Sequence, residues 1–243
     1  MKIERNILDC LKLYNPSNCK KRYGNAGDGG YVVVDGYEYD CYFSCGIGND
    51  ASFDNSFASN HPGISGLLFD GCISSLPFIA SKDMMFVSKN ISFIDTENTT
   101  SLNLETISYS NIFLKMDIES HEWKWIKHFS NFHKIKQFVI EVHGLFDPSW
   151  IEIGQYEYDD IFESLDKINQ THHLVHFHSN SAAEYRIVDG IELPTVAELT
   201  YIRKHDCQII GFNKTPLPIL DLDCKNTSYR HDLSFTKYPF CVD

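Results

Sequence analysis

The chain has 243 residues, of which 43% are hydrophobic and 22% charged, which excludes a disordered protein and allows one substantial core. Lys and Arg number 21 and Asp and Glu 33, so the formal net charge is −12. This acidic balance disfavours nucleic acid and anionic membranes as partners, because both bind basic surfaces. The sequence has no apolar run long enough for a membrane span, no secretory signal and no CxxC pair among its eight cysteines. We therefore expect a cytoplasmic protein with reduced thiols and no membrane span.

The chain is predicted to form a single domain with three parts. They are an N-terminal helix with a glycine-rich loop, a Rossmann-like core and a C-terminal extension, at residues 1–38, 39–205 and 206–243. The helix covers Met1 to Tyr14, where apolar residues recur on one face.

Within the core, apolar runs bounded by turn residues alternate with segments of helical period. The predicted strands are Asp40–Cys45, Ser65–Asp70, Met84–Val87 with Ile91–Ile94, Ile112–Asp117, Gln137–Val142, His173–His178 and Glu198–Arg203. One predicted helix begins after an N-cap at Asp50. Three others are predicted at Thr100–Tyr109, Ser120–Phe129 and Tyr156–Ile168. This alternation predicts an α/β fold with a largely parallel, doubly wound sheet. Such sheets bind ligands at the carboxyl ends of their strands.

The first predicted strand runs through Ser44 into a Gly46-Ile-Gly48 turn and then into a helix. Glycines at such a turn permit positive φ and let the backbone approach a ligand, although any tight strand-to-helix turn could show them. The third glycine of the dinucleotide pattern is missing, because position 51 is Ala. Asp70 ends the second strand 22 positions after Gly48, where an acid can accept ribose hydroxyls or simply face solvent. Together the two features favour a nucleoside cofactor.

Ionisable residues follow the next two buried strands. Asp117 and Glu119 come after one strand, and Glu141 and His143 end the other. The ends of neighbouring parallel strands meet at one edge of a sheet, and carboxylate oxygens suit a hard divalent cation. The alternative is a salt bridge from Lys115 to a glutamate together with a helix cap.

Three further features have two interpretations each. His176 and His178 alternate with apolar residues, which fits a hydrogen-bonded interior pair better than a metal site. The segment from Asn25 to Tyr31 is a hairpin turn or a loop that closes on a ligand. The three tryptophans, Trp123, Trp125 and Trp150, fit the core better than a sugar-stacking surface.

The ordered motifs resemble those of the FkbM-type S-adenosylmethionine-dependent methyltransferases, and are most similar to the branch related to the mammalian methyltransferase-like proteins. They are Asp28-Gly-Gly-Tyr31, Ser44-Cys-Gly46-Ile-Gly48-Asn-Asp50 and Leu114-Lys-Met-Asp117-Ile-Glu119-Ser-His-Glu122-Trp123, with Leu193–Arg203 similar to the last strand. The resemblance covers about residues 20–205. It departs from the pattern at Ser120, where the family usually has Gly, and we expect this Ser to cap the following helix.

The resemblance implies a Rossmann-like, seven-stranded class I methyltransferase sheet, mostly parallel with the last strand antiparallel. It implies S-adenosylmethionine as cofactor, with Gly46 and Gly48 at the methionine end and Asp70 at the ribose. The full cofactor-binding set is Asp28, Ser44, Gly46, Gly48, Asp50 and Asp70. Related sugar and catechol methyltransferases hold Mg²⁺ at the ends of the fourth and fifth strands. By position, Asp117, Glu141 and His143 would bind Mg²⁺ or Mn²⁺ here.

Many FkbM-type enzymes methylate hydroxyls of sugars, so the resemblance implies O-methylation of a sugar, a glycan or a glycosylated small molecule. Asp117, Glu119 and His143 are the expected catalytic residues, with His143 or Asp117 as the base. The alternatives are a catalytically inactive methyltransferase fold that acts as a scaffold, and a methyltransferase for another acceptor such as RNA. A dehydrogenase is disfavoured by the missing third glycine.

Overall fold

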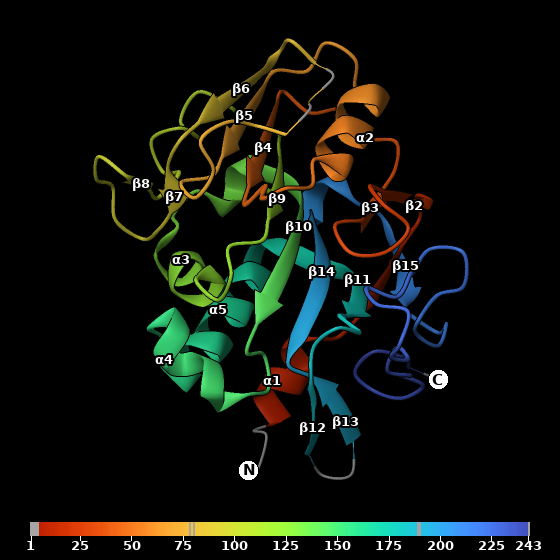
Figure 1. The fold of residues 1–243 in the computed structure, drawn as a ribbon. Coiled ribbons are helices and arrows are strands. Elements are labelled where there is room, and N and C mark those ends of the chain that lie inside the picture. The colour runs from red at the N-terminus through yellow and green to blue at the C-terminus, as the bar shows by residue number, and fades with distance from the viewer. Residues whose placement is uncertain (1–4, 78, 80, 189–190, 243) are drawn as a thin grey trace.

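The strands of the central sheet follow one another in the order β6-β5-β4-β9-β10-β14-β11. The computed structural model describes residues 5–77, 79, 81–188 and 191–242, and within them this sheet has seven strands (Figure 1). Their bounds are β4 Cys41–Cys45, β5 Gly66–Phe69, β6 Met84–Val87, β9 Ile112–Met116, β10 Ile135–His143, β11 His172–Ser179 and β14 Val196–Arg203. Every predicted core strand therefore lies in the sheet, except Ile91–Ile94.

The direction of the strands defines the fold. The pairs β4–β5, β4–β9, β5–β6 and β9–β10 are parallel, whereas β14 is antiparallel to both β10 and β11. A reversed last strand inserted between the fifth and sixth strands is the arrangement of the class I methyltransferase fold. The predicted fold class is confirmed, and so is the antiparallel strand at the end of the Leu193–Arg203 motif.

Alternation along the strands sends apolar side chains into two layers of core. On β9, Ile112, Leu114 and Met116 face a layer that contains α3 (Glu122–His128) and α5 (Tyr158–Thr171). Phe113 points the other way, toward α2 (Ser52–Asn60) and the hairpin of β2 (Lys20–Tyr23) and β3 (Tyr31–Val34). Trp123 and Trp125 are buried in the first layer, so their core interpretation is confirmed. Strands covered on both faces read as continuous apolar runs, which is why the sequence pattern located them.

Two predicted helices are wrong or too long. The segment Thr100–Tyr109, which the structure describes in full, contains β8 (Thr99–Thr100) and turns in place of a helix. Leu102 has a φ of +64°, which breaks a right-handed helix, and Leu104 and Ile107 face solvent. The N-terminal helix α1 covers Arg5–Cys10, while Tyr14 begins β1 (Tyr14–Pro16); residues 1–4 lie outside the described residues.

Two predicted helix caps are also corrected. The residue before α2 is Ala51, and Asp50 lies one position earlier, where its carboxylate accepts hydrogen bonds from the Ser52 N–H and hydroxyl. The hydroxyl of Ser120 has no hydrogen-bond partner among the described residues, and His121 precedes α3. Glu122, the first residue of α3, accepts the N–H groups of Ile118 and Ser120 in the preceding loop, and no side chain caps the helix itself.

The remaining elements frame the sheet. They are β7 (Asn90–Ile91), paired with β8; α4 (Ile151–Gly154); the hairpin β12 (Tyr185–Val188) and β13 (Ile191–Pro194); β15 (Ile209–Phe212), paired with β1; and 3₁₀ turns at Phe132–Lys134, Pro148–Trp150 and Lys204–Asp206. No helix in the described ranges is long and apolar enough to cross a membrane.

The C-terminal segment after β15 covers the edge strand β11 from both sides. Phe177 packs against the rings of Phe235 and Phe240, at centroid distances of 5.4 and 4.3 Å. On the other face of β11, His176 and His178 contact carboxylates of the same segment. The C-terminal segment therefore buries side chains on both faces of β11.

Candidate active site

A glycine turn connects β4 to α2 and forms one wall of the site. Gly46 and Gly48 have φ values of +75° and +56°, in the region that favours glycine. A side chain at Gly46 would overlap the backbone carbonyl of Asp117 at the end of β9. The turn therefore lies directly against the strand end that carries the acidic motif.

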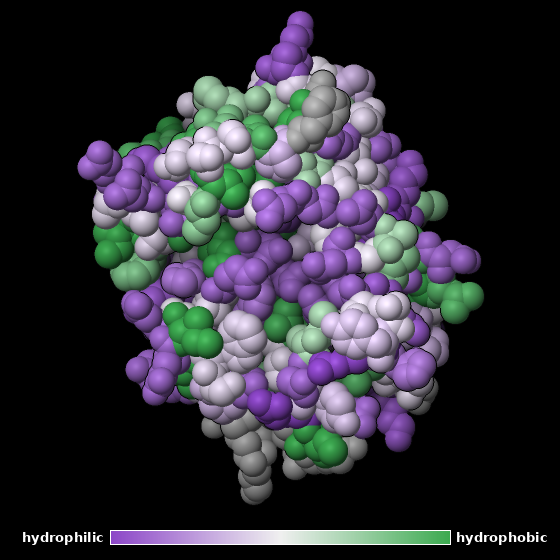
Figure 2. Space-filling model, viewed as in Figure 1, coloured by the Kyte–Doolittle hydropathy of each residue, from purple (hydrophilic) through white to green (hydrophobic). Residues whose placement is uncertain are grey.

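A cavity of about 680 Å³ opens beside this turn. Of the predicted site residues, it is lined by Asp28, Gly46, Gly48, Asp50, Asp70, Asp117 and Glu119. Ser44 does not line it; that side chain is fully buried and its hydroxyl has no partner among the described residues. Hydrophilic residues form a band across the middle of the face shown in Figure 2, between scattered apolar patches.

The segment from Asn25 to Tyr31 is a hairpin loop, as one of its two interpretations predicted, and it borders the cavity. It joins β2 to β3 as an antiparallel hairpin, and its Asp28, Gly29 and Tyr31 line the cavity. The Asn25 amide donates to Asp50 over 2.8 Å, which fastens the hairpin loop to the start of α2.

Asp70, predicted to bind ribose, organises the backbone around the cavity. One carboxylate oxygen accepts the N–H groups of Ile47 and Gly48, at 3.0 and 2.9 Å, and the other accepts those of Cys72 and Ile73. Burial raises the pKa of Asp70, but these four hydrogen bonds lower it below its ordinary value. Asp70 is thus ionised and holds the glycine turn in place. A ribose hydroxyl that donated to Asp70 would bind a carboxylate oxygen that already accepts two backbone N–H groups.

The acidic motif after β9 forms a cluster with the end of β10. Asp117, Glu119 and His143 each offer one ligand atom, and these atoms lie within 4.8 Å of one another. Glu119 and Ser120 have φ values of +53° and +79°, so two successive non-glycine residues are left-handed. Strain of this kind is tolerated where the surroundings impose it, often at functional sites. Glycine adopts this conformation without strain, so Ser120 occupies a position that favours glycine.

Glu122, to which the sequence assigned no role, orients His143. Its buried carboxylate lies 3.2 Å from Nδ1 of the imidazole, which directs Nε2 toward Glu119 at 3.5 Å and Glu141 at 3.9 Å. Burial lowers the pKa of His143, but the charge and hydrogen bond of Glu122, with Glu141 and Asp117, raise it to about 10. A carboxylate behind a histidine is a common arrangement in metal sites.

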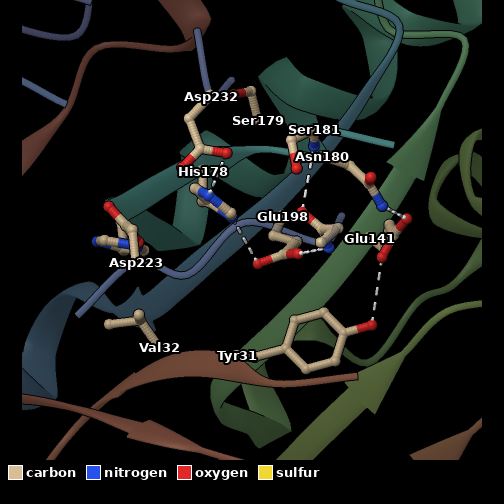
Figure 3. Close-up of polar contacts among 12 residues, drawn as sticks. Tyr31, Val32, Glu141, His178, Ser179, Asn180, Ser181, Glu198, Asp223 and Asp232 are labelled. Carbon is tan, nitrogen blue, oxygen red and sulfur yellow. Dashed lines mark hydrogen bonds and ion pairs between the residues drawn. The ribbon is translucent and has the colours of Figure 1, made fainter. Parts of the chain in front are cut away.

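Glu141 lies beside this cluster and is held by other polar groups (Figure 3). The hydroxyl of Tyr31 lies 3.2 Å from Asp117 and 3.4 Å from Glu141, and the Asn180 amide donates to Glu141 over 2.9 Å. Burial and the charges of Asp117 and Glu198 raise the pKa of Glu141 well above its ordinary value. The predicted proximity of Asp117 and Glu141 is confirmed, with a tyrosine between them.

The polar row continues across the sheet to the C-terminal segment. Glu198 on β14 is paired with Glu141 on β10, and its carboxylate lies 3.1 Å from Nδ1 of His178. The other nitrogen of His178 lies 3.5 Å from Asp232, and Figure 3 shows the two side chains next to each other. His176 bonds Asp223 over 2.7 Å. The hydrogen-bonded interpretation of the histidine pair is therefore confirmed.

The sequence alone does not assign three members of this site: Tyr31, Glu122 and Asn180. Tyr31 and Glu122 lie within the recognisable motifs, but a motif does not reveal which residues their side chains contact. Asn180 directly follows β11 at the same sheet edge, and only the order of the strands brings it to Glu141. Trp150 lies beside His143, with ring centroids 5.3 Å apart, and is only partly buried.

No protein-family model and no curated protein matches the chain. Among solved structures it is similar to a precorrin-6y C5,15-methyltransferase from Geobacter metallireducens GS-15, with a TM-score of 0.38, 10% identity, and 82% of this chain and 86% of that chain covered. The 16S rRNA methyltransferase KamB gives 0.36 and 12%, covering 75% and 99%. CalO1, a calicheamicin-biosynthesis methyltransferase with S-adenosylhomocysteine bound, gives 0.32 and 10%, covering 70% and 50%. The fold assignment rests on the sheet order and not on these distant similarities.

Proposed function

We propose that the protein is an S-adenosylmethionine-dependent O-methyltransferase that acts on a hydroxyl of a sugar, a glycan or a glycosylated small molecule, assisted by a divalent cation. The single observation that carries the proposal is the shared cavity. It has the glycine turn and Asp70 on one side and Asp117 and Glu119 on the other. A cofactor placed along the turn would present its reactive end to the acids.

The cavity fits the cofactor by its chemistry. Its positive-φ glycines leave backbone uncovered, and the apolar side chains of Phe53, Phe69 and Ile91 line it beside polar groups. A nucleoside needs this combination of flat apolar contact and hydrogen-bonding groups. S-adenosylmethionine supplies the activated methyl group, so the protein has to align the acceptor and take its proton.

We assign the removal of the acceptor's proton to the acidic residues. The side chain of Glu119 is 83% exposed, so it reaches an acceptor entering from solvent, while His143 behind it is buried. Because its neighbours raise the pKa of His143 to about 10, the imidazole is protonated at neutral pH in the chain alone. We therefore assign the acceptance of the hydroxyl proton to Asp117 or Glu119.

Asp117, Glu119 and His143 also fit a divalent cation. They combine two carboxylates with an imidazole whose far nitrogen is bonded to Glu122, and the ligand atoms are close enough to share one ion. Such an ion would lower the pKa of a sugar hydroxyl. Glu141 would act beside the ion, since its oxygens are bonded to Tyr31 and Asn180.

The test is transfer of labelled methyl from S-adenosylmethionine to a panel of mono- and oligosaccharides, with Mg²⁺, with Mn²⁺ and with a chelator. We expect product with the cation, and loss of more than about 100-fold in Asp117→Asn while S-adenosylhomocysteine still binds. Unchanged turnover in Asp117→Asn would refute the role of the acid. Cofactor binding with no transfer to any sugar would favour the scaffold or another acceptor such as RNA.

A further inference from the structure

Lys115 is a buried cation in the wall of the cavity, and the function proposed above gives it no role. It lies on β9, its exposed fraction is 6%, and it points to the same side of the sheet as Phe113 and Asp117. Moving an ammonium group out of water is costly unless an anion or several dipoles replace the water.

The partners of Lys115 leave its charge uncompensated. Its nitrogen donates to the carbonyl of Gly46 and lies 5.8 Å from the centroid of the Tyr31 ring. Across the described residues, no carboxylate oxygen lies within 4 Å of that nitrogen, so the alternative of a salt bridge from Lys115 to a glutamate is wrong. An ammonium group has three protons, and an anionic group of a ligand in the cavity could accept one that the Gly46 carbonyl does not use.

The charges of the cavity wall sort by sign. Five acidic residues line it: Asp28, Asp50, Asp70, Asp117 and Glu119. Among the described residues that line the cavity, Lys115 is the only lysine or arginine. This pattern fits a ligand that is cationic over most of its reactive end and anionic at one point next to Gly46. The amino-acid end of S-adenosylmethionine has that pattern, with a sulfonium, an ammonium and one carboxylate.

We propose that Lys115 is the counter-ion of the amino-acid carboxylate of the cofactor, while its bond to Gly46 keeps the glycine turn in place. The proposal rests on the function proposed above. The rival explanation is that Lys115 only supports the turn. The two differ in one respect, since a counter-ion distinguishes ligands with and without the carboxylate and a support for the turn does not.

A double-mutant cycle on the full chain tests this by calorimetry. The ligands are S-adenosylhomocysteine and its decarboxylated analogue, which keeps the amine and the thioether. Each binds wild type, Lys115→Met and Lys115→Arg. We expect wild type to lose about 10- to 100-fold in affinity when the carboxylate is removed. We expect Lys115→Met to bind both ligands with the weaker affinity, and Lys115→Arg to recover most of the difference.

The control is Lys204→Met, an exposed lysine in the 3₁₀ turn after β14, at the opposite edge of the sheet, which should bind both ligands like wild type. Equal loss for both ligands in Lys115→Met would overturn the proposal in favour of a support for the turn. Equal affinity of wild type for the two ligands would overturn it even if Lys115→Met does not fold. Failure of wild type to bind either ligand would instead refute the proposed function.

Discussion

The two sides of the cavity are built by different means. On the side of the glycine turn, backbone geometry and backbone N–H groups make the surface, and the residues involved lie within 27 positions of one another, from Gly46 to Ile73. On the acidic side, charged side chains make the surface, and Tyr31 meets Glu141 across 110 positions of sequence. The structure of the first side therefore depends on the absence of side chains where two backbone segments meet. The structure of the second side depends on how buried charges are compensated.

The largest expected effect comes from filling that space. Gly46→Ala places a methyl group into the carbonyl of Asp117 at a φ of +75°, so we expect a loss of more than about 3 kcal/mol in unfolding free energy. Gly48→Ala is the matched control, because nothing lies within 4 Å of its added Cβ and only the strain of about 1 kcal/mol remains. Equal losses in urea denaturation of the two variants would contradict the account.

The second-largest effect is expected when Asp70, which holds the glycine turn in place, is replaced. In Asp70→Asn, an amide NH₂ replaces one oxygen and faces two backbone N–H groups that have lost their acceptor. Each unsatisfied donor costs about 1–3 kcal/mol, so we expect a loss of at least about 2 kcal/mol in unfolding free energy, together with weaker cofactor binding. If Asp70 only met a ribose, the variant would lose affinity with its thermal unfolding temperature unchanged.

The third prediction concerns charge on the acidic side. Burial alone would lower the pKa of His178, but hydrogen bonding to Asp232 and Glu198 raises it to about 10 from an ordinary 6.5. The folded state therefore holds a proton that the unfolded chain has lost above pH 6.5. This contribution is complete below pH 6.5 and disappears as the pH rises through 10, with a slope of up to about 1.4 kcal/mol per pH unit.

Urea denaturation of wild type and His178→Gln at pH 7, 8 and 9 measures this contribution. The wild type should lose more unfolding free energy over that range than the variant, and the difference isolates His178 from other groups that titrate in both proteins. Parallel pH profiles would show that His178 is not charged in the folded state.

The smallest effect is expected at the tyrosine between the acids. Tyr31→Phe removes a hydroxyl that contacts Asp117 and Glu141, and we expect a loss of about 1 kcal/mol in unfolding free energy. Without this hydroxyl the two carboxylates repel each other more strongly, so the variant should bind Mg²⁺ more tightly. Calorimetric titration with Mg²⁺ checks this, and weaker binding would indicate that the hydroxyl supports the cation site.

The sequence predicted those parts of the fold in which local pattern decides. Buried strands appear as apolar runs, and their parallel register brings Asp117 next to Glu141, as expected. The helix expected at Thr100–Tyr109 fails because Leu102 is left-handed and polar side chains of Thr100 and Ser101 bond Glu105 and Asp95. The placement of Asn180, and of the C-terminal segment on His178, depends on strand order and on contacts across the chain that no local pattern encodes.

Titration of the purified chain with S-adenosylhomocysteine, with and without Mg²⁺, tests the central claim most directly. The account predicts a micromolar dissociation constant, and a change in affinity with Mg²⁺ if the cation binds at Asp117, Glu119 and His143. Absence of binding in both conditions would contradict a cofactor site in this cavity, and the Gly46–Gly48 segment would then be only a tight turn between β4 and α2.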